Sequence, residues 1–448
     1  MKPDTIELEK IAVIGGGITG IAAALELAAS QRFRITLFEK EDRLGGLSSS
    51  YHWQDGECDR FYHVILPSDF RLIGFLKELG LESRVIWRQS KSGFYGAKGL
   101  TSFASASDFL RFPYLSLLQK IRLGLGILRT SRIKDLSDVD GLFVEEWLLK
   151  MFGAGIYGNF WESLLRSKLG AAKDRTSAAL MAAIIQRLYA ARSSADKQER
   201  MGHVHGGYKT VWEAARSRLT ELGVTVCMLS PVLAAVPAGR GQGIDVSTPA
   251  GWAGRFDRML FTIPCPEVVK TLADKTHPYW DKIGRVDYIG VVCVLLILRR
   301  SLSPYYVINL LDRDLPFTGI IESTNVIPPQ ELENKTIVYL PKYLAWDDPL
   351  LRSSDREIVH LFLNKLRVIF PGMKEEDILH TAVFREPYTQ PVQEPHRLAD
   401  PVDVCTPLPR IYLANTSMIL NSTLNNDAAV SVARKAVEII LSAGGQNG

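Results

Sequence analysis

Apolar residues near the N-terminus form two short runs separated by a helical pattern. The first run, residues 11–14, ends in a glycine-rich turn, and the second, residues 35–38, ends at Glu39. Small and apolar residues between them repeat with the spacing of a buried helix. This order predicts strand, glycine turn, helix and strand, with a carboxylate at the offset at which an adenosine ribose is bound.

The glycine turn carries the chemistry expected of this unit. Gly15 permits a tight turn, Gly17 lets the backbone approach a pyrophosphate, and Gly20 lets the helix pack closely on the strand. Ile18 and Thr19 open the helix, whose first N–H groups point towards phosphate. The pattern therefore predicts a bound dinucleotide.

The periodicity further along predicts a mixed fold. We expect a hairpin, a helical middle and a β-rich stretch that contains one strand buried on both faces, followed by a terminal strand and helix. The corresponding residues are 48–65 for the hairpin, 94–200 for the helical part, 286–384 for the β-rich part, 291–298 for the buried strand, and 409–416 and 426–441 for the last two elements.

Composition restricts the class of protein. The 448 residues are enough for two or three domains, and 46% hydrophobic with 23% charged residues is typical of a globular protein. A net charge of +4 does not indicate a nucleic-acid partner. The five cysteines are scattered without CxxC spacing, and the pair His203 and His205 lacks further ligands. We therefore expect no disulfide framework, no metal site and a cytoplasmic location.

A second glycine pair distinguishes between dinucleotides. Gly45 and Gly46 follow the second strand directly, where an NAD-binding unit would enter its next helix, and Lys40 and Arg43 place cations beside them. Arg43 can neutralise phosphate. Residues 11–46 resemble the FAD-binding motif of the flavin amine oxidase superfamily, which includes protoporphyrinogen oxidases, phytoene desaturases and monoamine oxidases. The resemblance implies FAD as the cofactor.

The resemblance also implies an architecture. It is an α/β fold with a glutathione-reductase-type Rossmann FAD-binding domain and a discontinuous α+β substrate domain. The FAD-binding domain is expected in three segments, residues 1–93, 201–270 and 395–448. The substrate domain is expected as a helical part, residues 94–200, and a sheet part, residues 271–394.

The resemblance carries further FAD contacts to the middle and end of the chain. Val232 matches the position whose backbone lies against the adenine. Asn415 and Thr416 stand where the family has a glycine and an acid at the ribityl chain and pyrophosphate. Asn426 and Asp427 begin the last helix, whose N-terminus would face the flavin and stabilise negative charge there. Either residue can instead serve only as an N-cap.

Two features bear on the reaction. Amine-oxidising members have a lysine in the strand matching residues 283–292, and none is present there. This favours the branch that dehydrogenates or isomerises carbon skeletons. The segment ending at His63 resembles the Asp-x-Gly-x-His segment of flavin desaturases and sugar mutases, where an imidazole can take a proton or hydrogen-bond the flavin. A structural histidine is the alternative.

Further candidates lie near the end of the chain. Residues 384–391 are expected to form a loop on the substrate side of the flavin, where Tyr388, Gln390 and the nearby His396 would face substrate. They are otherwise ordinary loop residues. Cys405 is too close to the last strand to match the attachment cysteine of monoamine oxidases, so FAD is expected to be noncovalent.

Residues 108–134 interleave leucines and other apolar residues with arginine and lysine. Such a stretch can cover a substrate cavity, or it can lie on a membrane surface and admit a lipophilic substrate. The expected function is an FAD-dependent oxidoreductase that dehydrogenates a hydrophobic small molecule, with an electron acceptor that the sequence does not indicate. The alternatives are a nucleotide-sugar mutase and a flavin-binding protein without turnover.

Overall fold

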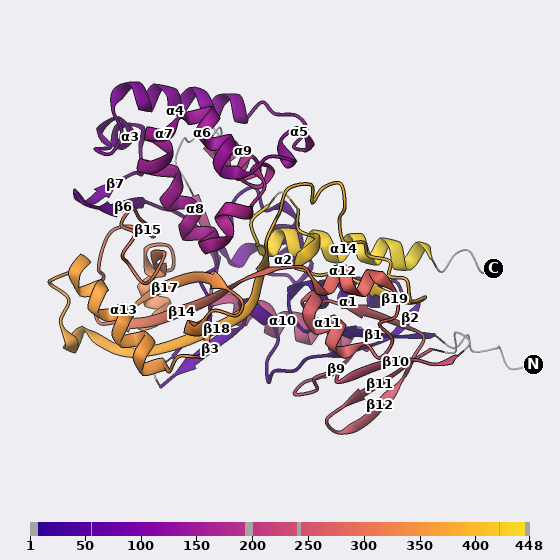
Figure 1. Ribbon diagram of the computed structural model, residues 1–448. Coiled ribbons are helices and arrows are strands. Elements are labelled where there is room, and N and C mark those ends of the chain that lie inside the picture. Colours follow the sequence, from indigo (N-terminus) through magenta and orange to yellow (C-terminus); the bar gives the residue numbers. More distant parts are fainter. Residues whose placement is uncertain (1–7, 55, 193–199, 240–242, 421, 444–448) are drawn as a thin grey trace, which may run out of the picture.

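The computed structural model describes most of the chain, and Figure 1 shows a helical region, a large sheet and a separate α/β region near both termini. The outer ends of the predicted segments 1–93 and 395–448 lie outside the described residues. The described residues are 8–54, 56–192, 200–239, 243–420 and 422–443.

A five-stranded parallel sheet, in the order β19-β13-β1-β2-β9, forms the nucleotide-binding region. It unites strands from three distant parts of the chain, which confirms the expected Rossmann-type α/β unit. The strands are β1 (Glu9–Ile14), β2 (Phe33–Phe38), β9 (Thr225–Cys227), β13 (Arg258–Phe261) and β19 (Ile411–Leu413).

Helices from both ends of the chain cover this sheet. The helix α1 packs against both α14 and α10, and α14 also packs against α2. Their apolar faces share one core with the strands. The bounds are α1 (Ile18–Ala29), α2 (Phe70–Glu78), α10 (Gly207–Glu221) and α14 (Asn426–Ser442).

A seven-stranded sheet, in the order β18-β14-β17-β16-β15-β6-β7, forms the second region. Every residue of β14, which lies between the edge strand β18 and β17, is buried, because α13 covers one face and the segment after the glycine pair covers the other. The bounds are β6 (Ser92–Gly96), β7 (Gly99–Ser102), β14 (Tyr288–Leu298), β15 (Val307–Leu310), β16 (Gly319–Glu322), β17 (Thr336–Ala345), β18 (Ile378–Pro391) and α13 (Asp355–Ile369).

The helical region lies over one end of this sheet (Figure 1). No helix in the described part of the chain is both long and apolar enough to cross a bilayer. The helices are α3 (Ala106–Arg111), α4 (Leu117–Thr130), α5 (Ser137–Asp140), α6 (Val144–Phe152), α7 (Ala154–Ile156), α8 (Glu162–Leu169) and α9 (Ala178–Arg192).

Smaller elements complete the fold. The predicted hairpin is present as β3 and β4, while a three-stranded sheet of β10 to β12 was not anticipated. The bounds are β3 (Ser50–Trp53), β4 (Gly56–Asp59), β5 (Val85–Gln89), β8 (Arg200–Val204), β10 (Ala234–Pro237), β11 (Ile244–Thr248), β12 (Gly251–Phe256), α11 (Cys265–Thr271) and α12 (Pro278–Gly284).

Two expectations about these elements were wrong. The predicted helical part, residues 94–200, begins with the strands β6 and β7. These strands extend the large sheet, because β6 pairs with β15 and β7 pairs with β6. The expected loop, residues 384–391, is the end of β18, which pairs with β14 as an edge strand.

Candidate cofactor and active site

The glycine turn adopts the geometry that a tight strand-to-helix connection requires. Gly15 has φ of +113°, a conformation that other residues rarely adopt. A Cβ on Gly20 would lie 1.9 Å from the Gly15 carbonyl oxygen, so only glycine allows this close packing. Thr19 and Ile18 are buried in the first turn of α1. The turn therefore fixes the N-terminus of α1 directly after β1.

The surroundings of this helix end fit a bound dinucleotide. Gly17 caps α1 without any side-chain hydrogen bond, and a Cβ on it would meet only the Cα of Gly46, at 3.9 Å. The free space above Gly17 and the uncapped N–H groups of α1 suit a pyrophosphate. The hydroxyl of Thr416 is buried and interacts with the hydroxyl of Tyr288.

Glu39 is buried at the end of β2 and holds two loops together. Its Oε2 accepts a hydrogen bond from the backbone N–H of Gly16 at 2.6 Å, and its Oε1 accepts one from the N–H of Glu41 at 2.8 Å. Burial raises the pKa of this carboxyl, while the two backbone hydrogen bonds act in the opposite direction. Its backbone carbonyl accepts from Ser230, which brings the segment containing Val232 close to the same end of the sheet.

The two cationic side chains in the loop after β2 interact with other parts of the protein and not with the glycine turn. Gly45 donates to the Gly16 carbonyl at 2.8 Å, so the second glycine pair does lie against the first turn. Arg43 instead pairs with Asp42 and donates to the Ser50 carbonyl at 3.0 Å. Lys40 is exposed beside Glu41, 3.7 Å from its carboxylate. Phosphate contacts of Lys40 and Arg43 therefore remain predictions.

The C-terminal residues separate into different roles. Asn415 is buried, accepts from the Ser417 N–H at 3.0 Å and donates to the Ile263 carbonyl at 2.7 Å, so its amide is engaged by protein. The N-cap of α14 is Asn425, which precedes the two residues predicted for that role and accepts from Ala428 at 2.8 Å.

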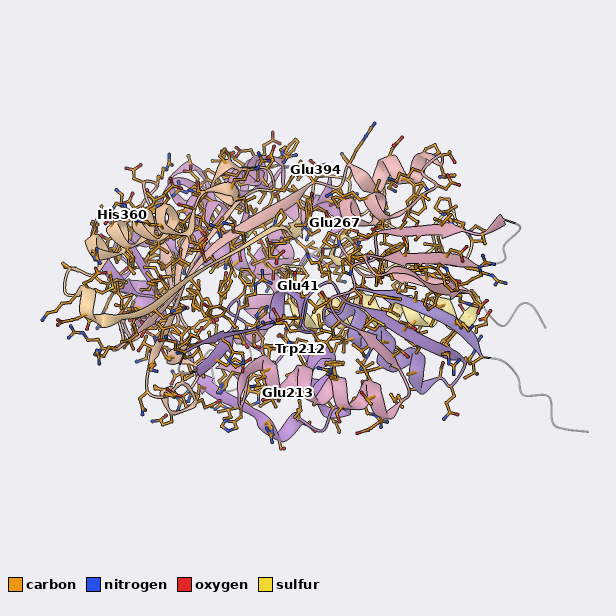
Figure 2. All side chains as sticks on the ribbon, turned by 90° about the horizontal axis from the view of Figure 1, so that it is seen from below. Glu41, Trp212, Glu213, Glu267, His360 and Glu394 are labelled. Atoms are coloured by element: carbon orange, nitrogen blue, oxygen red, sulfur yellow. The ribbon has the colours of Figure 1, made fainter. Side chains whose placement is uncertain are left out.

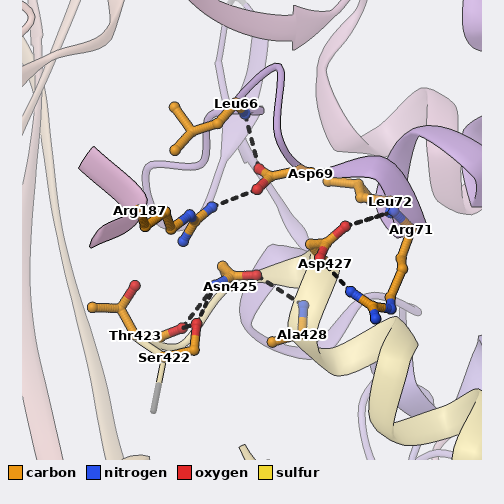
Figure 3. Close-up of polar contacts among 10 residues, drawn as sticks. All are labelled: Leu66, Asp69, Arg71, Leu72, Arg187, Ser422, Thr423, Asn425, Asp427 and Ala428. Atoms are coloured by element: carbon orange, nitrogen blue, oxygen red, sulfur yellow. Dashed lines mark hydrogen bonds and ion pairs between the residues drawn. The ribbon is translucent and has the colours of Figure 1, made fainter. Parts of the chain in front are cut away.

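Asp427 caps a different helix, as Figure 3 shows. Its Oδ1 accepts from the N–H groups of Arg71 and Leu72, at 2.7 and 3.0 Å, in the first turn of α2. Asp69 beside it pairs with Arg187 of α9. These contacts line a cavity of about 340 Å³ between α2, α9 and α14. The carboxylate of Asp427 is thus turned to α2, and its predicted flavin contact is not evident in these contacts.

His63 belongs to a polar chain that also contains the predicted Asn426. Its Nδ1 lies 2.9 Å from the Phe61 carbonyl and must donate, because a carbonyl only accepts. Its Nε2 lies 3.3 Å from the hydroxyl of Ser48, which also donates to Asn426 Oδ1 at 3.1 Å. One hydroxyl proton serves two acceptors, so one acceptor is left for another donor. Burial lowers the pKa of His63 to about 4, and the ring is neutral near pH 7.

The motif analysis overlooked Ser48 and two aromatic residues that support it. The indole of Trp212 donates to the Ser48 carbonyl at 2.7 Å, and Figure 2 shows Trp212 near the middle of the molecule. Tyr208 packs edge-on against His63, with ring centroids 5.4 Å apart. Ser48 lies two residues after the glycine pair, and this proximity was its only signal. The aromatic residues lie on α10 and have no sequence signal for this contact.

The segment that ends at His63 is fastened to the large sheet. Arg60 and Glu386 form an ion pair of 2.8 Å, and the hydroxyls of Tyr62 and Tyr343 are 2.9 Å apart. Their partners on the sheet, Glu386 and Tyr343, belong to a set of side chains that we call the inner row. These side chains lie on one face of the sheet, at positions paired across β18, β14 and β17. The inner row consists of Gln390, Ile289, Glu386, Val291 and Tyr343.

Asp59 precedes this segment and is held by its backbone and side chain. Its carbonyl accepts from Tyr339, and its carboxylate accepts from the N–H of Tyr208 at 3.0 Å. Burial raises the pKa of this carboxyl to about 7. The segment therefore stands between α10 and the inner row with little freedom to move.

The three remaining candidates are separated. Gln390 lies opposite Ile289 in the inner row, on the face where the helical region meets the sheet. Tyr388 lies in a bulge and contacts Tyr288, Trp346 and Lys270. His396 is exposed, in a left-handed backbone conformation. The structure thus brings Gln390 to the face of the sheet that meets the helical region, but it does not bring the other two beside it.

Comparison with known proteins identifies the family. The model of the flavin-containing amine oxidoreductases matches residues 18–440. The chain belongs to this family. Its fold and flavin chemistry are thereby shown, in agreement with the resemblance carried by the glycine motifs.

The relatives of this family member are distant. Zeta-carotene desaturase of Synechocystis is 20% identical over 96% of this chain and 97% of its own. Mitochondrial protoporphyrinogen oxidase of Nicotiana tabacum is 25% identical over 66% of both chains. An oxidoreductase structure from Methanosarcina mazei covers 96% of the chain with a TM-score of 0.76 at 17% identity, and a reduced UDP-galactopyranose mutase covers 98% with 0.73 at 15%. The two structures share the fold.

No group of three or more His, Cys, Asp or Glu side chains within the described ranges is arranged to hold a metal ion. The pair His203 and His205 instead shares the carboxylate of Glu331, at 2.9 and 3.1 Å. This contact ties β8 to the loop before β17.

Proposed function

We propose that this flavoprotein binds FAD noncovalently and dehydrogenates the carbon skeleton of a hydrophobic small molecule. Bound flavin would supply the hydride acceptor. Among the described groups, Gly17, Glu39 and Thr416 would hold the dinucleotide, and the Ser48 to His63 chain would lie beside the flavin ring. The electron acceptor is left open.

The observation that carries the proposal is the apolar surface of β14. All eleven of its residues are buried, and none of them is a lysine or another charged residue. The inner-row members Ile289 and Val291 come from this strand. The flanking strands contribute polar groups to this row, and Glu386 among them is paired with Arg60. The apolar strand itself suits a hydrophobic carbon skeleton and offers no base for the oxidation of an amine.

Because the His63 ring is neutral, its role in such a reaction is that of a hydrogen-bond acceptor. With Nδ1 donating to Phe61 and a pKa of about 4, the ring does not carry a proton near pH 7. Nε2 therefore acts as a hydrogen-bond acceptor that orients Ser48 or a ligand. Gln390 and the tyrosine pair of Tyr62 and Tyr343 provide further polar contacts for substrate.

Anaerobic titration of the flavin-loaded protein tests the reaction class. Bleaching of the flavin absorbance by a lipophilic substrate alone supports dehydrogenation. A requirement for prior chemical reduction without net oxidation supports a nucleotide-sugar mutase instead. Acid precipitation should release all of the flavin as FAD, and flavin retained in the pellet would contradict noncovalent binding. His63→Ala with unchanged FAD content and turnover would show that His63 is structural.

We also propose that the face formed by α3 and α4 contacts an anionic membrane surface, which would deliver a lipophilic substrate. Leu117, Leu118, Ile121 and Leu125 fall within one 100° sector of α4 and are all exposed, Leu118 to 80%. Exposed basic residues flank the sector, as expected of a helix lying on anionic lipid. They are Arg111, Arg122, Arg129, Arg132 and Lys134.

A further inference from the structure

The helix α10 touches every member of the polar chain that contains His63, although the three members come from distant parts of the sequence. Its Trp212 donates to the carbonyl of Ser48 at 2.7 Å. Its Tyr208 packs edge-on against the ring of His63, and the side chain of Asn426 forms a hydrogen bond with the Tyr208 hydroxyl. One helix therefore contacts all three members of the chain.

The two aromatic residues of α10 are themselves held in place. The rings of Tyr208 and Trp212 are stacked, with their centroids 5.7 Å apart. A Cβ on Gly45 would lie 2.3 Å from Nε1 of Trp212, so only a glycine there lets the indole reach Ser48. The first glycine of the second pair thus accommodates α10.

Two carboxylates fix the start of α10. Asp59 accepts a hydrogen bond from the N–H of Tyr208 at 3.0 Å, and Glu331 accepts one from the N–H of Gly206 at 2.9 Å. A helix cannot satisfy the N–H groups of its own first turn, so these bonds also stabilise it. The Tyr208 side chain therefore extends to His63 and Asn426 from an anchored backbone.

The contact with Tyr208 sets the direction of the hydrogen bonds in the chain. Burial raises the pKa of the Tyr208 phenol, and the hydrogen bond from Asn426 acts in the opposite direction, as expected of a donor. An amide that donates through its nitrogen has its oxygen left to accept, and this oxygen lies 3.1 Å from the donating hydroxyl of Ser48. The same proton cannot also serve Nε2 of His63, at 3.3 Å. Nε2 is therefore the acceptor that remains open.

We propose that Tyr208 is a positioning residue that keeps Nε2 of His63 open to accept a hydrogen bond from reduced flavin. The inference rests on the proposed function, which puts this chain beside the flavin ring. Reduced flavin carries an N–H at N5 that oxidised flavin lacks, so an open acceptor stabilises the reduced form selectively. Without the phenol, the Asn426 amide can flip and donate to Ser48, whose proton then goes to His63 and closes the acceptor.

Nitrogen NMR of the FAD-loaded protein with isotope-labelled histidine tests the direction of these hydrogen bonds. The Nε2 signal of His63, assigned by its loss in His63→Ala, should be that of a free acceptor in oxidised wild type and should move upfield on reduction with dithionite. In Y208F, which keeps the ring but lacks the hydroxyl, the upfield signal should be present before reduction and change little. Tyr114→Phe, whose hydroxyl accepts from Lys98 in the helical region, is the control and should match wild type.

The redox potential of the bound flavin gives a second readout. Closing the acceptor should lower the affinity for reduced relative to oxidised FAD by about tenfold, as for one hydrogen bond, and a tenfold change is about 30 mV for a two-electron couple. Y208F should therefore have the lower potential. The difference should vanish in a His63→Ala background, because Tyr208 acts through His63.

Identical Nε2 signals in wild type and Y208F, a wild-type signal that does not move on reduction, or equal potentials would overturn the proposal. Neither measurement needs a substrate, so failure of the dehydrogenase proposal in the anaerobic titration is a separate result.

Discussion

Glu39 carries its function through two hydrogen bonds to loops that meet at the cofactor site. Replacement by alanine removes both bonds and the carboxylate expected at the ribose. We expect Glu39→Ala to lower FAD affinity by about tenfold or more, since each lost bond to a charged group is worth roughly 1.5–3 kcal/mol. The ratio of flavin to protein absorbance after purification measures this. Glu41→Ala, an exposed neighbour, is the control, and full yellow cofactor in Glu39→Ala would contradict the ribose assignment.

Glu322 gives a prediction of pH dependence. It is buried at the end of β16, and burial raises the pKa of its carboxyl from 4.5 to about 7, although Ser301 and Ser303 donate to it. Between these two pH values the unfolded chain releases this proton and the folded chain keeps it. Folding is therefore favoured at the acid end, and this group lowers the free energy of unfolding by up to about 3 kcal/mol as pH rises through the interval.

Glu322→Gln should remove that decline, because glutamine does not ionise. Urea unfolding at about pH 5 and about pH 7 measures it, with the exposed Glu213→Gln on α10 as control. As pH rises, the free energy of unfolding of Glu322→Gln should increase relative to that of wild type. A difference independent of pH would show that Glu322 is already ionised in the folded protein at pH 5.

At the scale of elements, α2 depends on a carboxylate from the far end of the chain. Asp427 accepts from two N–H groups that α2 cannot satisfy itself. We expect Asp427→Ala to lower the free energy of unfolding by about 1–2 kcal/mol, as for the loss of an N-cap, whereas Asp427→Asn keeps the acceptor and most of the stability. Urea unfolding measures both. Loss of FAD with unchanged stability would instead support the flavin contact predicted for Asp427.

Elements with strong local patterns were predictable from the sequence. The glycine turn, the hairpin of β3 and β4 and the apolar β14 each carry their own signal within a few residues. The strand β18 was mistaken for a loop, because Pro387 and Pro391 interrupt it. Proline is tolerated there because β18 is an edge strand, which is a property of the sheet rather than of the segment.

The residues of the candidate site were likewise predictable only where they belong to a local sequence motif. The residues of the glycine loops and Glu39 follow from spacing, whereas the residues around His63 come from three separate parts of the chain, namely Ser48, α10 and α14. Asp427 lies in the first turn of α14, as predicted, but its carboxylate caps the neighbouring helix α2.

At the scale of the whole molecule, the exposed leucines of α4 predict behaviour at a membrane. L118E with I121E replaces apolar contact by negative charge, so we expect flotation of the FAD-loaded protein with anionic vesicles to fall at least severalfold. Val368→Glu, an exposed apolar site on α13, is the control. Absence of flotation by wild type would remove the membrane proposal, and unchanged flotation by the double variant would place the contact elsewhere.

The buried strand β14 also has a consequence for synthesis. Both of its neighbours in the sheet, β17 and β18, follow it along the chain. During translation an eleven-residue apolar segment therefore leaves the ribosome with neither edge paired. One edge lacks its partner until residue 345 has been made, and the other until residue 391. Such a segment is prone to pair with other nascent chains. Yield of folded protein should accordingly depend on chaperones more than its final stability suggests.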